Sequence, residues 1–250
     1  MMKTAIKPIA LATAVSIASM AGVISTAQAA DGDTIETKQP LIKGLSGNIG
    51  VVSQYIFRGF VENDNPSVQG GFDWAADNGI YVGYWGSNIG YGDDDRNGVE
   101  NDFYAGWGGG DKVTWDIGLL YYAYLNVSDA NVPELYGSIG FGPVTLGTTY
   151  ALDDAVWINK GDMYWTLAAE GEVVGGFNLG AKAAWYYYGD EGEFLTDQTR
   201  SSAFNSLDLS VSHALGASGA DMGLHYIFGG KTRFDNELDD NIVLSLSFGF

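Results

Sequence analysis

The last ten residues constrain this chain more than any other segment. Every second residue from Ile242 to Phe250 is Ile, Leu or Phe, and the residues between them are Val, Ser or Gly. An alternation of period two is typical of a β-strand with one apolar face and one face of different character. The sequence therefore ends on an amphipathic strand whose final residue is aromatic.

Such a strand has two interpretations. It is either the last strand of a soluble β-sandwich or the C-terminal signal by which the insertion machinery recognises bacterial outer-membrane barrels. In the second case Leu246, Phe248 and Phe250 carry the signal, and barrel-insertion machinery and periplasmic chaperones are the expected partners. The rest of the sequence distinguishes between a soluble β-sandwich and an outer-membrane barrel.

The N-terminus favours the exported protein. Lys3 and Lys7 precede a run of apolar and small residues from Ile9 to Ile24, and Ala27-Gln28-Ala29 forms an A-x-A cleavage site. This arrangement predicts a cleaved signal peptide over residues 1–29. Residues 30–44 then form a periplasmic or lumenal N-terminal segment, and residues 45–250 form the remaining domain.

Composition excludes several classes of protein. Lys3 and Lys7 are the only charged residues of the predicted signal peptide, so the formal net charge of −19 becomes −21 in the mature chain. A chain this acidic is a poor partner for nucleic acid. It has no cysteine, so a disulfide framework and a thiolate metal site are excluded. Outside the signal peptide no run of 18 apolar residues predicts a membrane helix, and no motif points to a cofactor or a metal.

Twelve alternating segments follow the predicted signal peptide, each about as long as a tilted membrane strand. The connections after even-numbered segments are short and those after odd-numbered segments are longer and polar, as in outer-membrane barrels. The predicted fold is all-β: a single closed antiparallel transmembrane β-barrel of about 12 strands with periplasmic termini. Its segments are 45–59, 67–76, 80–88, 99–109, 112–124, 134–142, 144–151, 162–173, 176–188, 205–214, 220–229 and 241–250.

Charged residues within these segments share one parity, and large apolar residues take the other. Alternation alone does not say which face points inward. In a barrel the charged parity is lumenal, and the candidate pore-lining residues on it are Arg58, Asp73, Glu100, Asp102, Asp116, Glu134, Glu170, Lys182, Asp208 and Asp221, with Lys112 as a third basic residue beside Arg58 and Lys182. In segment 80–88 both parities are plausible lipid-facing sides.

Aromatic residues on the apolar parity form two bands, which decides for the membrane barrel. The band near the long loops comprises Tyr55, Phe57, Phe103, Tyr121, Tyr150, Trp165, Trp185, Tyr187, Tyr226 and Phe228. The band near the short turns comprises Phe72, Trp74, Trp107, Trp115, Phe141, Phe177, Phe248 and Phe250. Between them lie aliphatic residues such as Leu119 and Leu209.

Several segments also resemble one family. Residues 53–59 (SQYIFRG), 65–73 (NPSVQGGFD), 79–88 (GIYVGYWGSN), 100–106 (ENDFYAG) and 116–122 (DIGLLYY) are similar to the TorF family of proposed porins, and the likeness covers nearly the whole mature chain. Gln54 departs from the Asn expected there. The resemblance implies a proteobacterial outer-membrane barrel with pore activity, and it implies no particular solute.

Twelve strands predict a narrow pore, since eight strands fill with side chains and sixteen leave a wide channel. Eight inward acidic residues against three basic ones favour small cationic or neutral solutes. Alternatively, the same charges could pair with one another and close the lumen. The protein would then be a non-conducting structural or adhesive barrel in contact with lipid and lipopolysaccharide. An outer-membrane lipid hydrolase is disfavoured, because His213 and His225 are the only histidines and no G-x-S-x-G motif is present. The acidic stretches 93–95 and 239–240 could hold Ca²⁺ or bridge lipopolysaccharide through divalent ions, but their spacing fits no EF-hand, and solvated charge runs are the common case.

The C-terminal signal gives the first testable prediction. Deletion of Phe250, or addition of a charged tail after it, should lower the amount of protein in the outer membrane while export to the periplasm continues. Cell fractionation with immunoblotting measures both quantities. Unchanged outer-membrane levels would contradict the assignment.

Overall fold

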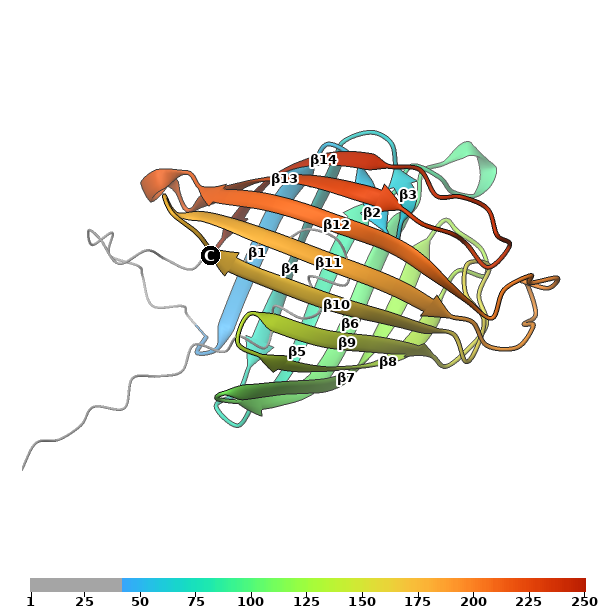
Figure 1. Ribbon diagram of the computed structural model, residues 1–250, viewed down its shortest axis with the longest axis horizontal. Coiled ribbons are helices and arrows are strands. Elements are labelled where there is room, and N and C mark those ends of the chain that lie inside the picture. The colour runs from blue at the N-terminus through green and yellow to red at the C-terminus, as the bar shows by residue number, and fades with distance from the viewer. Residues whose placement is uncertain (1–41) are drawn as a thin grey trace, which may run out of the picture.

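The computed structural model describes residues 42–250, which form an all-β structure (Figure 1). The predicted signal peptide and residues 30–41 lie outside the described residues. Twelve strands form a closed antiparallel barrel, so the predicted fold class is confirmed. They are β1 (Leu45–Val52), β4 (Ser67–Ala75), β5 (Ile80–Asn88), β6 (Val99–Gly110), β7 (Val113–Leu125), β8 (Val132–Phe141), β9 (Val144–Ala151), β10 (Met163–Glu172), β11 (Phe177–Tyr187), β12 (Ser202–Ala214), β13 (Ala220–Gly229) and β14 (Asn241–Gly249).

Helical structure is minimal in this part of the chain. Two short 3-10 turns occur, η2 (Asp93–Asp95) and η3 (Gly216–Ser218). Within residues 42–250 no helix is long and apolar enough to span a membrane.

The barrel closes where its first strand meets its last. β1 pairs with β4 on one side and with β14 on the other, with Ile49 opposite Phe248 and Val51 opposite Leu246. Beyond β14, the backbone N–H and carbonyl of Phe250 exchange hydrogen bonds of 2.9 and 2.8 Å with Gly47. A Cβ on Gly47 would lie only 2.8 Å from the Phe250 ring, so the glycine makes room for the terminal side chain. The C-terminal strand therefore completes the hydrogen-bonded wall.

The two ends of the barrel differ as the sequence predicts. Connections of two to five residues, such as 111–112 and 215–219, lie at the end that carries the C-terminus (Figure 1). The longer connections, such as 89–98 and 188–201, lie at the opposite end, which we call the long-loop end.

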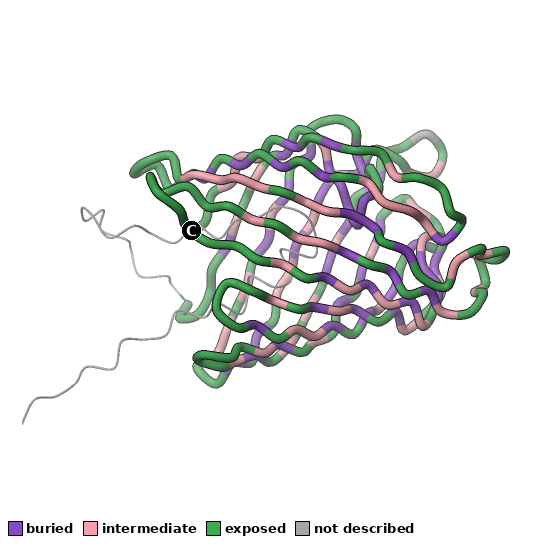
Figure 2. Tube along the Cα trace, viewed as in Figure 1, coloured by how far each residue is buried: buried purple, intermediate pink, exposed green. Residues whose placement is uncertain are grey.

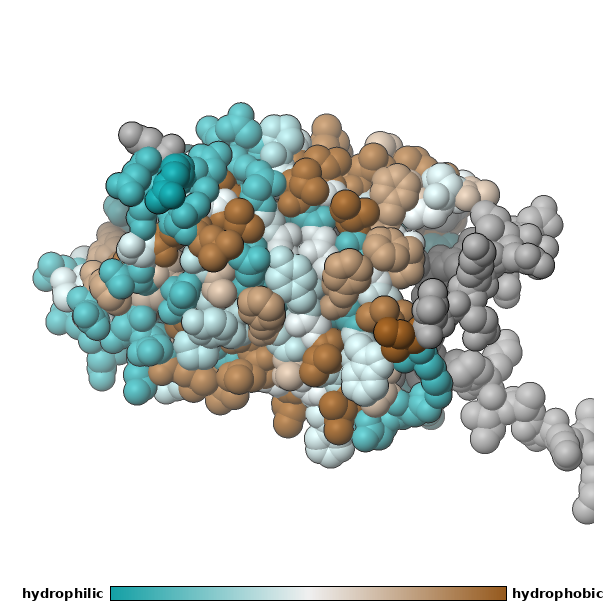
Figure 3. Space-filling model, turned by 180° about the vertical axis from the view of Figure 1, so that it is seen from behind, coloured by the Kyte–Doolittle hydropathy of each residue, from teal (hydrophilic) through white to brown (hydrophobic). Residues whose placement is uncertain are grey.

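Side chains alternate between the outer surface and the interior along the wall strands, with an interruption in β12, where Asn205 and Ser206 are both buried at a register shift. Leu119 and Leu209 are 45% and 42% exposed on the outside, and Figure 3 shows hydrophobic side chains spread over the wall with hydrophilic ones at the long-loop end. In β5 the outward residues are Ile80 and Val82, whereas Tyr81 and Trp85 are buried inside. This settles which face of segment 80–88 points outward.

The first predicted strand is wrong in its second half. β1 ends at Val52, and the chain then forms a separate hairpin of β2 (Tyr55–Phe57) and β3 (Phe60–Asn63), which lies at the long-loop end (Figure 1). Tyr55 and Phe57 were predicted to face lipid, but they are 1% and 3% exposed. The alternation continues past Val52, so the sequence pattern does not reveal that the chain leaves the wall.

The face assignment gives the second prediction. Lys at Leu119 or at Leu209 should lower the free energy of unfolding by about 2–4 kcal/mol, because it places a charge on the apolar outer surface. Lys at Ser210, which points inward on the same strand as Leu209, is the matched control and should cost much less. Urea unfolding from phospholipid vesicles measures all three, and equal losses would contradict the assignment of inward and outward faces.

Candidate constriction at the long-loop end of the barrel

The hairpin of residues 55–63 turns at two residues with positive φ. Phe57 pairs with Phe60, and the residues between them, Arg58 and Gly59, have φ values of 49° and 83°. Two-residue loops with positive φ at both positions are type I′ turns, in which Asn-Gly is preferred. A side chain as large as Arg costs about 1–2 kcal/mol in this conformation, so the contacts of Arg58 must offset that cost.

The Arg58 side chain reaches across the interior to Glu134 on β8. Nη1 donates to Oε1 at 2.9 Å and Nη2 donates to Oε2 at 2.6 Å, so the pair is bidentate. The side chains of Arg58 and Glu134 are 1% and 0% exposed. A buried, hydrogen-bonded charge pair of this geometry holds the hairpin turn against the opposite wall.

Hydroxyl groups of three further strands complete the coordination of the guanidinium. Arg58 donates to the hydroxyls of Tyr122 on β7, Thr149 on β9 and Tyr186 on β11 at 3.1 to 3.3 Å. The Nε of Arg58 is buried and has no partner within residues 42–250. The turn is thus attached to β7, β8, β9 and β11 through one side chain.

Aromatic rings surround the same guanidinium. Its carbon lies 4.8 Å from the ring centres of Phe57 and Tyr164 and 5.8 to 6.0 Å from those of Trp157, Tyr122 and Tyr186. Cations within about 6 Å of an aromatic face are stabilised by the ring quadrupole. We call the wall and loop residues of this site, which are Tyr122, Glu134, Thr149, Trp157, Tyr164 and Tyr186, the Arg58 cage.

Trp157 is the one member of the cage that comes from a loop. Its indole N–H donates to the carbonyl of Ala130 at 2.7 Å, and its ring packs edge-on against Phe57 and Tyr122. The loop that carries it is fixed by Asp162, which accepts hydrogen bonds from the backbone of Asn159 and Gly189 and forms a buried ion pair with Arg233. Four long loops are therefore joined beside the cage.

A group of carboxylates lies at the hairpin, with Glu62 on β3 and with Glu100 and Asp102 on the wall strand β6. Glu62 accepts a hydrogen bond from Tyr91, and Glu100 accepts one from Tyr124 at 3.0 Å. Glu62, Glu100 and Asp102 are all at most 8% exposed. Burial raises the pKa of Glu62 to about 7, and the bond from Tyr91 opposes this. One oxygen each of Glu100 and Asp102 finds no partner in the described part of the chain.

Two more of the predicted pore-lining acids are bound to tyrosines nearer the short turns. Asp73 accepts a hydrogen bond of 2.6 Å from Tyr104, and Asp116 accepts one of 2.7 Å from Tyr81, whose hydroxyl also contacts Tyr136. Figure 2 shows that buried residues concentrate in the barrel half near the long loops. The packed interior thus combines aromatic and acidic residues with aliphatic ones such as Leu120 and Val243.

The remaining candidates form a separate group on β10 to β13. Asp208 lies opposite Lys182 in the β11–β12 register and is 3.1 Å from Nδ1 of His225. Asp221 is buried near the short-turn end of β13, and Glu170 is exposed near the same end of β10. These residues take the inward parity, but they lie apart from the Arg58 cage.

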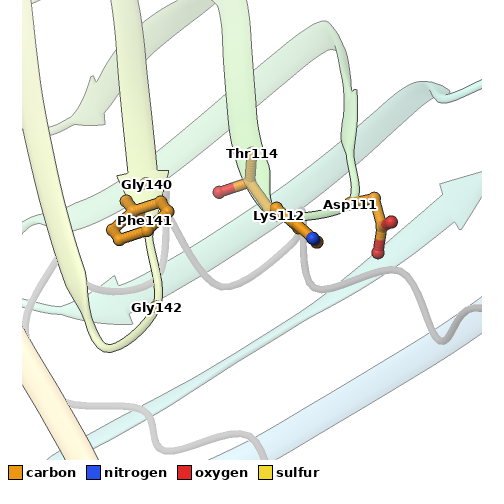
Figure 4. A pocket seen from close by; sticks show the side chains of 6 residues that line it. All are labelled: Asp111, Lys112, Thr114, Gly140, Phe141 and Gly142. Carbon is orange, nitrogen blue, oxygen red and sulfur yellow. The ribbon is translucent and has the colours of Figure 1, made fainter.

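Lys112 is not part of the lumenal wall. It was assigned to the charged parity, but it lies exposed in the turn before β7. There it lines a shallow pocket of about 360 Å³ with Asp111, Thr114, Gly140, Phe141 and Gly142 (Figure 4). As a residue of the two-residue turn, Lys112 lies at the short-turn end of the barrel rather than on its inner face.

Sequence reasoning missed Glu62, Tyr91, Trp157 and the Asp162–Arg233 pair. All of them lie in the hairpin or the long loops, where no periodicity assigns a face. Glu62 did carry a signal, because it lies three residues after the Arg58-Gly59 turn, but the turn itself was interpreted as strand.

Comparison with known proteins places the chain in a family. It belongs to the Gcw_chp family, described as bacterial proteins of unknown function, whose model matches residues 40–173. This match does not confirm the resemblance to the TorF family. No curated protein matches the chain.

Solved structures share the barrel fold at low sequence identity. An outer-membrane channel from Pseudomonas putida F1 is 11% identical with a TM-score of 0.53, covering 87% of this chain and 99% of that one. A chain solved in work on the in-meso crystallization of membrane proteins is 10% identical with a TM-score of 0.50, covering 82% and 83%. OccK5 (OpdH) of Pseudomonas aeruginosa is 13% identical with a TM-score of 0.42, covering 84% and 68%.

The buried ion pair gives the third prediction. Glu134→Gln should lower the free energy of unfolding by about 3–5 kcal/mol, because it leaves the buried Arg58 charge uncompensated. Replacing both partners, as in Arg58→Met with Glu134→Leu, should cost less than the single change. Denaturant unfolding of the three proteins tests this, and a double variant less stable than Glu134→Gln would contradict it.

Proposed function

We propose that this protein is an outer-membrane, porin-like channel for passive diffusion of ions or small solutes, and that the hairpin of residues 55–63 forms its constriction. The observation that carries the proposal is the Arg58–Glu134 pair. It fastens a separate hairpin across the interior of a closed barrel, at the end with the long loops. A hairpin that is not part of the wall can change position without opening the wall.

An outer-membrane location is supported by the surface of the barrel. Large hydrophobic side chains are exposed around the wall, and contiguous apolar surface of this extent is unusual on soluble monomers. Apart from Tyr55 and Phe57, the residues of the two predicted aromatic bands take the outward parity. The channel of Pseudomonas putida F1 with the same fold is an outer-membrane protein. This proposal also includes the predicted cleavage of a signal peptide, contacts with lipopolysaccharide, and the likeness to the TorF proteins.

Cation preference follows from the charges near the hairpin. Glu62, Glu100 and Asp102 together outnumber the one basic residue there, Arg58, once Glu134 has paired with it. A passage bordered by carboxylates concentrates cations. These carboxylates are buried while Arg58 is bound to Glu134. We therefore infer that the cation preference appears when the hairpin moves away from the wall.

The same geometry favours a second candidate function, a non-conducting structural barrel. Arg58 and Glu134 are inaccessible to water, which is the state expected if the hairpin never moves. A lipid hydrolase gains no support, since both ring nitrogens of His213 face backbone carbonyls, at 2.6 Å from Ala214 and 3.1 Å from Gly175.

Planar-bilayer recording of purified protein under a salt gradient gives the fourth prediction. Wild-type protein should show small or intermittent conductance with a cation-selective reversal potential, which is larger at low salt where screening is weak. Glu100→Gln with Asp102→Asn should move the reversal potential toward zero. Asp77→Asn with Asp111→Asn, which removes the same charge from exposed turns, is the matched control.

An anion-selective wild type would contradict the cation preference. Persistent silence of a correctly folded barrel, also after Glu134→Gln, would instead support the structural function.

A further inference from the structure

We propose that the Arg58 cage is a binding site for solutes that carry a guanidinium group, and that Arg58 occupies it as a tethered competitor while the channel is closed. This inference rests on the proposed channel function for its role, but the site itself is defined by contacts within residues 42–250.

The residues of the cage all lie outside the hairpin. Tyr122, Glu134, Thr149, Tyr164 and Tyr186 lie on five consecutive wall strands, β7 to β11, and Trp157 lies in the loop between β9 and β10. Trp157 is held by Ala130, and its loop by Asp162. If the hairpin withdraws, only Arg58 and Phe57 leave, and the carboxylate, the hydroxyls and four rings remain in place.

The geometry of the cage selects guanidinium over other cations. Both oxygens of Glu134 are engaged by two different nitrogens of one planar group, at 2.9 and 2.6 Å. An ammonium ion offers a point charge and does not reproduce this parallel pair. The hydroxyls of Tyr122, Thr149 and Tyr186 accept further N–H groups, and the rings suit a flat, weakly hydrated cation.

The tethered occupant fits the site imperfectly, which makes it displaceable. The φ of Arg58 is 49°, a conformation that a long side chain seldom adopts. Its Nε remains buried without an acceptor, so one of the five guanidinium N–H donors is unused. A free guanidinium ligand has no backbone restriction and is not tied to the orientation of the turn.

Charge balance links binding of a solute to withdrawal of the hairpin. Glu134 is fully buried, and Arg58 is the cation that pairs with it. Because an unpaired buried carboxylate is strongly disfavoured, the hairpin leaves readily only when another cation replaces Arg58. A guanidinium solute supplies that charge in the same geometry and thereby stabilises the open form.

The test uses Arg58→Ala, which empties the cage, with methylguanidinium as the probe. Methylguanidinium should raise the melting temperature of the folded full-length variant and change its Trp fluorescence in a saturable manner. Methylammonium, a cation without the planar group, and urea, a neutral molecule of similar shape, should be at least about tenfold weaker. Equal effects of the three compounds would overturn the proposal.

Two further variants locate the response. Adding Glu134→Gln to Arg58→Ala should abolish the stabilisation, whereas adding Trp157→Phe should keep it and remove most of the fluorescence change. A response that survives Glu134→Gln would place binding elsewhere and refute the assignment.

A second measurement keeps Arg58 in place, in case Arg58→Ala does not fold. The chain contains no cysteine, and Phe60 is exposed on the hairpin, so Phe60→Cys offers a unique position for an environment-sensitive fluorophore. Methylguanidinium should shift its emission at concentrations where urea and methylammonium do not, and a shift with all three or with none would contradict displacement of the hairpin.

Failure of this inference and failure of the channel proposal give different results. A barrel that is silent in bilayers, yet shows the methylguanidinium response, has the site without the channel. A barrel that conducts without that response has a channel in which Arg58 is only a structural anchor.

Discussion

The structure depends first on the requirement that no strand be left with an unpaired edge. An exposed edge presents a row of free N–H and carbonyl groups, which is costly in hydrocarbon and invites aggregation in water. Here the requirement is met by pairing β1 with β14, and the hydrogen bonds between Gly47 and Phe250 extend that pairing to the last residue. Closure in turn fixes which side chains point inward. The interior charges are a consequence of the register, and they have to be paired, bound to tyrosines or left to interact with solutes.

The wall was predictable because its signal is repeated. Each strand other than β5 independently shows apolar residues on one parity, and β5, β9 and β13 begin and end at the predicted residues. The alternating connection lengths fixed the direction of successive strands. The one ambiguous strand, β5, needed the structure, since Tyr81 and Trp85 are large enough for a lipid face but are used inside the barrel.

The constriction was only partly predictable. The sequence indicates that Arg58 and Glu134 share the inward parity, and it permits a pairing between them. It does not show that Arg58 arrives on a turn, because Tyr55, Ile56 and Phe57 continue the strand pattern and Arg-Gly is not a usual turn pair. The positions of Glu62 and Trp157 could not be predicted, for a related reason. They are set by tertiary contacts of the hairpin and of a long loop, and neither segment has a periodicity that assigns a face.

The left-handed backbone at Arg58 has a consequence for how this protein can vary. Asn or Gly at that position would relieve the turn locally, so the conformation of the turn alone selects against arginine there. Arginine at this position makes the turn less stable, but it places a positive charge in the interior of the barrel. A redesign that optimised the loop by common turn preferences would gain a better turn, but it would leave the buried Glu134 carboxylate without its cation and detach the hairpin from four strands of the wall.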